Sequence, residues 1–312
     1  MKYLDTKKWF IAALVLLIVC ACSDEKDDAA NEWNATYVYL HRSDYLSTNV
    51  KTFNLTHDAE GIRGDEISMA FTVKTQKTVS KDVVVNLDIN SDFKDLDMSK
   101  VSLSSKIATI KAGEQSSEEV TIQVDPSIFS TIEDKFSYSL NVLINAISTN
   151  NENTVISGNL SKLSATINKT AFCNLRSGVP TASSLLKTKT EWSFAFQDGV
   201  ENPNSNTVAG TGINDVATNG VPFWLTVDFQ AVKTISGIQT VHWTAYFAPS
   251  QIEVFTSSNG NTWKSIGILT TYGKTQNITF IAPVQTRYLK YQMVTVPSRV
   301  DIMTFYVYTP NE

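Results

Sequence analysis

The chain has 312 residues, of which 42% are hydrophobic and 18% are charged, and its formal net charge is −5. This composition is too apolar for a disordered protein, and at roughly 100–200 residues per domain the length predicts about two domains. The acidic balance argues against a nucleic-acid partner, because phosphate binding needs a basic surface. Three histidines and three cysteines leave little room for a metal cluster or a disulfide scaffold.

Residues 1–22 have the pattern of a targeting signal. Three lysines at positions 2, 7 and 8 precede an apolar run over residues 9–19, which is shorter than the roughly 20 residues that span a bilayer. The run ends in Val19-Cys20-Ala21-Cys22, which resembles a bacterial lipobox. The resemblance implies cleavage before Cys22 and lipidation of its thiol. An ordinary secretory signal with chance cysteines is the alternative.

Residues 23–34 are expected to form an acidic tether, which begins with Ser-Asp-Glu-Lys-Asp-Asp at 23–28. This run resembles the export signal of Bacteroidetes lipoproteins, which implies a lipid-anchored chain on the outer face of the outer membrane. A solvated linker is the plainer explanation, since like charges keep a segment extended, and both can hold together. If Cys20 is removed and Cys22 acylated, Cys173 has no disulfide partner and is expected to be a buried small hydrophobic group.

From about residue 35 the apolar residues follow a period of two, which is typical of strands with one face buried. The alternation predicts strands over residues 67–74, 83–90, 120–124, 138–146 and 163–167. No segment has a sustained apolar stripe at helical spacing. The pattern predicts an all-β chain whose first domain, residues 35–168, is an antiparallel sandwich.

Residues 30–168 resemble the Bacteroidetes domain of unknown function 1735. The resemblance rests on Thr-Tyr-Val-Tyr at 36–39, on residues 107–114, and on the strand pair 120–124 and 138–144. It implies an immunoglobulin-like sandwich beside the lipid anchor, with a spacer and docking role and no chemistry of its own.

Residues 171–312 resemble the discoidin, or coagulation factor 5/8 type C, domain, a family that includes the family 32 carbohydrate-binding modules. The markers occur in order at residues 196–199, 223–229, 235–238, 249–254, 257–263 and 286–290. The resemblance implies a jelly-roll β-sandwich with Trp224 and Trp263 in its core. Asn259-Gly260, between two extended runs, predicts a type I′ hairpin.

The resemblance also implies that ligands bind to loops at one end of the barrel. An aromatic ring can stack on the apolar C–H face of a sugar, while His, Arg, Asn or Asp can bond its hydroxyl groups. Three loops carry such groups and predict a carbohydrate site, with these candidates: Trp192, His242, Trp243, Tyr246, Arg299 and Asp301. The insertion 201–220 is expected to frame the site through Asn214 or Asp215.

Each candidate also has a structural explanation. Trp192 could cap the end of the barrel, and His242 could simply satisfy a neighbouring carbonyl group. Trp243 has the same ambiguity as His242, and Tyr246 could be a packing residue ahead of the proline. Arg299 could pair with Asp301 instead of with a ligand.

Neither a cofactor nor an active site is expected. Relatives often bind a structural calcium ion near an Asp-Gly turn; Asp198 matches the aspartate, but Thr304 stands where a glutamate ligand would fall, so no metal is assigned. The chain has no His-Glu-x-x-His, Gly-x-Ser-x-Gly or P-loop motif. A glycosidase needs two opposed carboxylates in a cleft, and two sandwiches of this size offer no obvious place for one.

The sequence therefore predicts a surface lipoprotein that binds an oligosaccharide or polysaccharide without catalysis. Family analogy implies a Sus-like uptake system, with a TonB-dependent transporter and its glycan-binding lipoprotein as partners. The alternative is a cell-surface adhesion protein that uses the same loops to bind a protein. Phospholipid binding fits poorly because the loops lack a cluster of Lys and Arg, and a purely structural accessory subunit remains a third reading.

Overall fold

The computed structural model describes residues 34–44, 50–94, 97–211 and 214–311. The expected signal peptide, Cys22 and nearly all of the acidic tether lie outside the described residues. Contacts divide the chain into two compact units, of which the second comprises Asn54–Asp65, Pro126–Phe136 and the continuous segment from Asn168 onward. Among the described residues, no helix has both the length and the apolar character needed to cross a bilayer.

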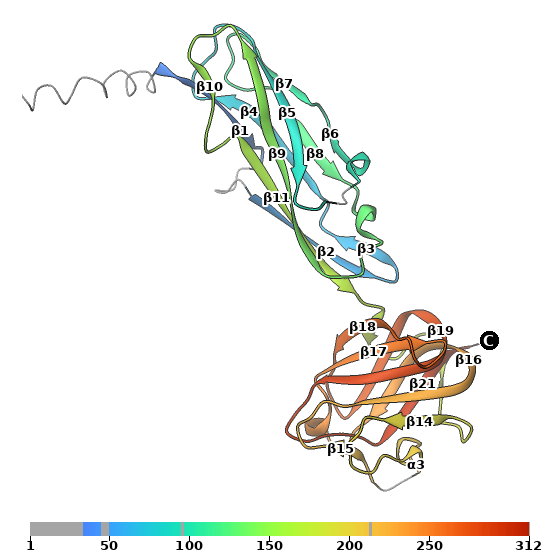
Figure 1. The fold of residues 1–312 in the computed structure, drawn as a ribbon. Helices are drawn as coiled ribbons and strands as arrows, with labels where there is room; N and C mark the ends of the chain where they lie inside the picture. Colours follow the sequence, from blue (N-terminus) through green and yellow to red (C-terminus); the bar gives the residue numbers. More distant parts are fainter. Residues whose placement is uncertain (1–33, 45–49, 95–96, 212–213, 312) are drawn as a thin grey trace, which may run out of the picture. The chain divides into compact units, whose positions relative to one another are not determined.

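The N-terminal half is built from two sheets (Figure 1). One has five strands in the order β10-β1-β4-β8-β6, and the other has six in the order β3-β2-β11-β9-β5-β7. Two 3-10 turns, η1 (Met98–Lys100) and η2 (Pro126–Phe129), accompany them. The strands are β1 (Thr36–Arg42), β2 (Val50–Asp58), β3 (Gly61–Gly64), β4 (Ser68–Thr75), β5 (Val83–Ser91), β6 (Val101–Leu103), β7 (Ile107–Ile110), β8 (Val120–Val124), β9 (Phe136–Thr149), β10 (Thr154–Ile156) and β11 (Lys162–Phe172).

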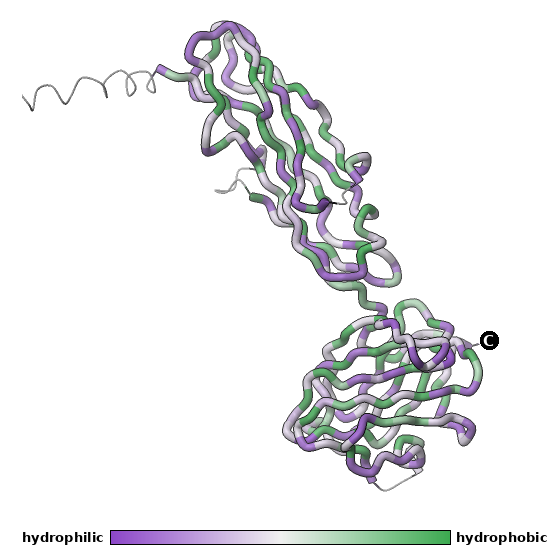
Figure 2. The backbone as a smooth tube through the Cα atoms, in the orientation of Figure 1, coloured by the Kyte–Doolittle hydropathy of each residue, from purple (hydrophilic) through white to green (hydrophobic). Residues whose placement is uncertain are grey.

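The alternation in the sequence is matched by alternation in burial. In β4 every second residue is buried, and β8 buries Val120, Ile122 and Val124 while Gln123 stays exposed. Figure 2 shows the same alternation of hydrophobic and hydrophilic positions along the strands. Because side chains in a strand point to opposite faces in turn, these strands turn one apolar face inward. The predicted all-β fold class is confirmed.

The C-terminal half is dominated by one eight-stranded sheet with the path β13-β21-β16-β19-β17-β18, to which β12 and β14 add by pairing with β19 and β16. A separate two-stranded sheet joins β15 to β20. Two short helical turns, α3 (Ser205–Val208) and η3 (Ala245–Phe247), lie in the connections. The strands are β12 (Leu175–Ser177), β13 (Ser183–Leu186), β14 (Ser193–Phe196), β15 (Val216–Thr218), β16 (Trp224–Val241), β17 (Gln251–Ser257), β18 (Lys264–Thr270), β19 (Thr275–Thr295), β20 (Val300–Ile302) and β21 (Thr304–Pro310).

The two long strands, β16 and β19, bring both of their ends to one end of the sandwich. They run antiparallel: Trp224 pairs with Gln292, and Val241 pairs with Thr275. The register shifts between Asp228 and Lys233, about midway along β16. Gln251, at the start of β17, pairs with both Thr270 and Thr295. The connections at residues 242–250, 271–274 and 296–303 therefore meet at the same end, which we call the loop end.

The core contains a residue that the sequence analysis overlooked and lacks two that it expected. Phe223 is fully buried, as are Leu225 and Val227, whereas Trp224 and Trp263 are only half-buried. Strand alternation explains the difference at Trp224, because the inward face already begins at Phe223 and the next residue must point outward. The ring of Trp224 lies beneath the Lys290 ammonium, 5.3 Å from its centroid.

The expected type I′ hairpin at Asn259-Gly260 is wrong. That turn needs positive φ at both central residues, and here only Gly260 has it, at 75°. The connection runs from Ser257 to Lys264. It is shaped by the Asn259 side chain, whose Oδ1 accepts hydrogen bonds from the backbone N–H groups of Asn261 and Thr262, 2.9 Å each. Asparagine here acts through its side-chain carbonyl and not through its backbone conformation.

A pair of neighbouring substitutions tests the corrected core. Phe223→Ala should lower the free energy of unfolding by about 3–5 kcal/mol, because it removes a fully buried aromatic ring. Trp224→Ala should cost clearly less, since that ring is half in water. Chemical denaturation of both variants measures the difference, and a larger loss for Trp224→Ala would contradict the assignment of faces on β16.

Candidate functional site

The loop end is organised around a buried acid, Asp301, on the short strand β20. Its carboxylate accepts a bifurcated hydrogen bond from the Trp243 backbone N–H, with distances of 3.1 and 3.3 Å to the two oxygens. The His242 ring is also fully buried: Nδ1 donates to the Asp301 carbonyl oxygen, and Nε2 forms a hydrogen bond with the Thr240 hydroxyl at 3.2 Å. His242 and Asp301 cannot touch a ligand directly in this structure. They fix the start of the loop that carries Trp243.

Trp243 and Tyr246 are the exposed aromatic residues of this loop. Trp243 is 51% exposed and Tyr246 is 85% exposed. The turn η3 presents Tyr246, because the Thr244 hydroxyl oxygen accepts a hydrogen bond from the Tyr246 backbone N–H and caps the turn. Both rings are therefore exposed to solvent at the loop end.

Arg299 supplies the charged part of the loop end. Its guanidinium donates to the Asp215 carboxylate at 3.1 and 3.2 Å and to the Glu201 carboxylate at 3.2 Å, not to Asp301 as the sequence analysis allowed. It also lies 6.0 Å from the Phe247 ring centroid. The hydrogen bonds that Arg299 donates to Asp215, and after that to Glu201, hold the pKa of Arg299 above its ordinary value.

The insertion 201–220 brings these carboxylates into place. Its strand β15 pairs with β20, with Ala217 opposite Asp301, which brings the insertion beside the segment that carries Arg299. The Arg299 side chain then reaches the Asp215 carboxylate. A further isolated bridge joins Glu201 to Ala217. Figure 1 shows β15 and α3 lying at the same end of this sandwich. Of the two residues named for the insertion, Asp215 lies at the loop end, where it accepts hydrogen bonds from Arg299.

Trp192 does not belong to this surface. It is 4% exposed and lies in the hydrophobic core, where its ring packs edge-on against Phe229 with centroids 4.8 Å apart. The expectation that Trp192 stacks on a ligand is therefore wrong in this structure, and the alternative of a packing residue holds. Its neighbours along the chain are polar residues, a pattern typical of a loop tip. The strand β14 begins at the next residue, and Trp192 packs into the core against Phe229.

Tyr272 is the exposed aromatic residue that the sequence analysis missed. It lies in the connection between β18 and β19 and is 80% exposed. The Lys274 carbonyl oxygen in the same connection accepts a hydrogen bond from the His242 backbone N–H, 2.9 Å. The two aromatic loops are thus neighbours. The available signal was an aromatic residue followed by Gly273, in a segment too polar for a strand.

Comparison with known proteins agrees with this architecture. A family model for the F5/8 type C domain matches residues 181–304. Residues 181–304 form an F5/8 type C domain. Such domains are typically non-catalytic binding modules, and the predicted jelly-roll fold of this half is confirmed. A second model, for a domain of unknown function (DUF4999), matches residues 2–77. The expected resemblance to domain 1735 is not confirmed, since a different model matches there.

Solved structures resemble the chain at low identity. A two-domain protein of unknown function from Bacteroides fragilis is 16% identical, with a TM-score of 0.42, over 92% of this chain and 99% of its own. An F5/8 type C domain from the same species is 14% identical, with a TM-score of 0.37, over 43% and 100%. A family 32 carbohydrate-binding module from C. perfringens, solved in complex with galactose, is 16% identical, with a TM-score of 0.35, over 40% and 98%. A comparison with curated proteins gave no match.

The F5/8 type C domain described here does not fit the calcium site that the family resemblance implied. Asp198 is exposed, and Thr304 offers one neutral hydroxyl oxygen in place of a carboxylate. Calcium takes six to eight oxygen ligands and depends on carboxylates among them. Within the described residues, no three His, Cys, Asp or Glu side chains gather closely enough to hold a metal ion.

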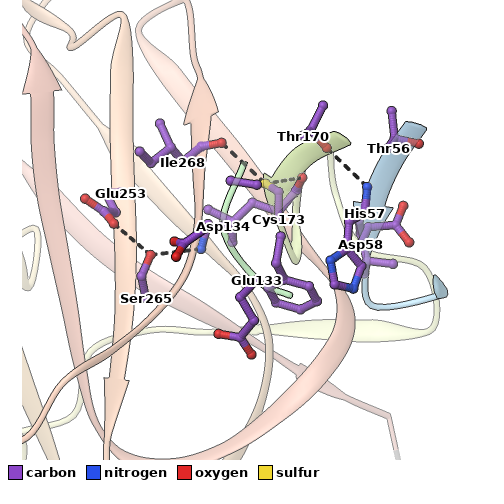
Figure 3. A pocket seen from close by; sticks show the side chains of 15 residues that line it. Thr56, His57, Asp58, Glu133, Asp134, Thr170, Cys173, Glu253, Ser265 and Ile268 are labelled. Carbon is purple, nitrogen blue, oxygen red and sulfur yellow. Dashed lines mark hydrogen bonds between the residues drawn. The ribbon is translucent and has the colours of Figure 1, made fainter. Parts of the chain in front are cut away.

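Apart from the loop end, the second compact unit contains a hollow of about 660 Å³ around Cys173 (Figure 3). The Cys173 thiol has the carbonyl oxygens of Ile268 and Leu175 as its hydrogen-bond acceptors, at 3.3 and 3.6 Å. Burial raises the pKa of this thiol above its ordinary value. His57, also in the lining, has its Nδ1 engaged with the Ile132 carbonyl and the Lys169 ammonium, at 3.2 and 3.3 Å. This is not the arrangement of a thiolate activated by a base.

The anchoring role of Asp301 can be measured by substitution. Asp301→Ala leaves the Trp243 N–H without its acceptor and empties a fully buried position, and it should lower the free energy of unfolding by about 1–3 kcal/mol. Asp301→Asn keeps an acceptor oxygen in the same place and should cost less. Equal denaturation curves for Asp301→Ala and the unmodified chain would contradict this role.

The raised pKa of Cys173 predicts a slow thiol. The thiolate is the reactive form, so raising the pKa lowers its fraction at any pH below that value. In a variant with Cys20 and Cys22 replaced by serine, the rate at which Cys173 reacts with a disulfide reagent should increase as the pH is raised from about 7 to about 9. Over that whole range it should stay slower than in the same chain unfolded in guanidinium. Equal rates in the folded and unfolded chains would contradict the burial of this thiol.

Proposed function

We propose that the F5/8 type C domain binds a glycan at the loop end and that the whole chain acts by binding, without catalysis. The observation that carries this proposal is the pair of exposed rings, Trp243 and Tyr246, on a loop whose start is fixed by the buried Asp301. Exposed aromatic rings leave apolar surface in water, and a sugar can cover that surface with its C–H face. A loop anchored in this way has little conformational entropy to lose on binding.

The polar groups beside the rings suit hydroxyl groups better than an acidic ligand. Arg299 is matched by the two carboxylates of Asp215 and Glu201. The cluster therefore has no excess positive charge to attract a carboxylated or sulfated glycan. Its remaining donor and acceptor positions can be shared with sugar hydroxyl groups, which both donate and accept.

We further propose that Cys22 carries a lipid and that the chain is held at the outer face of an outer membrane. The lipobox-like residues 19–22 and the acidic run that follows them support this proposal. A lipid-anchored glycan binder suits a Sus-like uptake system, in which it would pass oligosaccharide to a TonB-dependent transporter. Labelling with radioactive palmitate tests the anchor: the wild-type chain should be labelled and Cys22→Ala should not.

A glycan-array screen of residues 30–312 tests the binding function. We expect binding to one class of neutral glycan and a loss of about tenfold or more in affinity for Trp243→Ala with Tyr246→Ala, because stacking and its buried area are lost together. Val232→Ala is the matched control, since Val232 is also exposed but lies at the bend of β16, away from the loop end.

Two outcomes would contradict the proposal. In the first, the array shows no glycan bound by the wild-type chain. In the second, the double variant retains full binding while its circular dichroism is unchanged. If a protein partner is bound instead, and simple sugars fail to compete with it, the adhesion alternative replaces the glycan proposal.

A further inference from the structure

A small polar pocket lies at the loop end, beside the exposed rings of Trp243 and Tyr246 to which the glycan proposal assigns the ligand. It has a volume of about 180 Å³. A water molecule occupies about 30 Å³ of liquid, so this space would hold roughly six waters, or one sugar ring. The lining residues, none of which is charged, are Ser177, Gly178, Thr271, Tyr272, Thr275, Gln276 and Asn277.

Tyr272 provides an aromatic surface at this pocket. The residue is 80% exposed, so most of its ring is in contact with water. The following Gly273 has a φ of 87°, a conformation that allows the tight turn between β18 and β19. A ring held out of the core on a tight turn gives a hexose a flat apolar face to cover.

Asn277 provides a hydrogen-bond donor whose orientation is fixed in advance. Its Oδ1 accepts from Gln239 Nε2 at 2.8 Å and from the Tyr308 hydroxyl at 2.9 Å. Gln239 and Tyr308 are themselves bonded at 3.2 Å, which closes the network. Among the described residues, no acceptor is bonded to Asn277 Nδ2. This amide group is therefore directed and free to donate to a hydroxyl.

The pocket and the Trp243 loop share one support. The Pro249 carbonyl oxygen, in the loop after η3, accepts hydrogen bonds from Thr271 Oγ1 at 2.8 Å and from Gln276 Nε2 at 2.9 Å. The bond from the His242 backbone N–H to the Lys274 carbonyl oxygen joins the two loops a second time. The two surfaces are thus neighbouring parts of one rigid end of the sandwich.

From these observations we infer that the pocket at Tyr272 and Asn277 is a second sugar subsite, which takes an uncharged hexose unit. This inference rests on the glycan proposal for Trp243 and Tyr246. It adds that the ligand is an oligosaccharide that reaches from one surface to the other, not a single terminal sugar. An uncharged lining favours a neutral unit, because a charged one would lose hydration here with no opposite charge to offset it.

Titration calorimetry on the full chain in detergent tests the inference, with ladders of neutral oligosaccharides from one to six units: galactan, glucan, mannan and N-acetylglucosamine series. In the series that binds, affinity should rise by about tenfold between one unit and the longer members. Tyr272→Ala should remove most of that gain, a loss of about three- to tenfold, and leave the affinity for the monosaccharide unchanged. Tyr272→Phe keeps the ring and should bind like the wild type.

The failures of the two proposals are distinguishable. If the monosaccharide binds but length adds nothing, or if Tyr272→Ala binds the long ligand normally, the second subsite is wrong while the glycan proposal stands. If only acidic glycans bind, the neutral subsite is also wrong. If the chain binds no glycan, both proposals fail. Thermal unfolding of each variant checks that Tyr272→Ala and Tyr272→Phe remain folded.

Discussion

The loop end depends on one carboxylate that has no contact with water. Burying an ionisable side chain is costly unless its hydrogen-bonding capacity is used, and Asp301 uses it on the backbone of Trp243. The strand that carries Asp301 is also the only partner of β15 in its small sheet, so the same short segment holds the insertion. Two loops that are far apart in sequence are positioned by three residues of β20.

This arrangement separates the residues that support the loops from those that face solvent. His242 and Asp301 are fully buried, while Trp243, which follows His242 in the sequence and donates its backbone N–H to Asp301, is half exposed. Adjacent residues in the sequence, His242 and Trp243, therefore have different roles: the first supports the loop and the second faces solvent. The proposed binding surface gains rigidity from buried polar groups that a ligand would not touch, which is how a shallow site can be ordered before it is filled.

The sequence was most informative where periodicity or composition decides the outcome. Alternating apolar residues predicted β4, β5, β8, β9 and β11, because a period of two allows only one buried face. Choosing which aromatic residue is exposed was harder. Trp192 and Tyr272 both stand among polar residues in the chain, yet one packs on Phe229 and the other is in water. That choice is made by which strand follows each residue and by contacts across the sheet, and neither is visible locally.

The partners of charged residues were equally hidden. Arg299 is two positions from Asp301, and proximity in sequence suggested that they pair. The Asp301 carboxylate, however, is fully buried and accepts from the Trp243 backbone, and Arg299 donates to carboxylates of the insertion instead. Its partners are 84 and 98 residues away in the chain. The pairing of β15 with β20, together with the bridge from Glu201 to Ala217, brings the insertion beside Arg299.

The bend shared by β16 and β19 has a consequence for how such a domain can change over time. Both strands leave the loop end and return to it, and the hydrophobic core contains no residue of the connections 242–250 and 271–274. Substitutions or length changes in residues 242–250 or 271–274 that spare the anchors at His242 and Pro249 would leave that core intact. The same scaffold could acquire a preference for a different ligand by exchanging these short segments, while its folding continues to depend on the core of the strands.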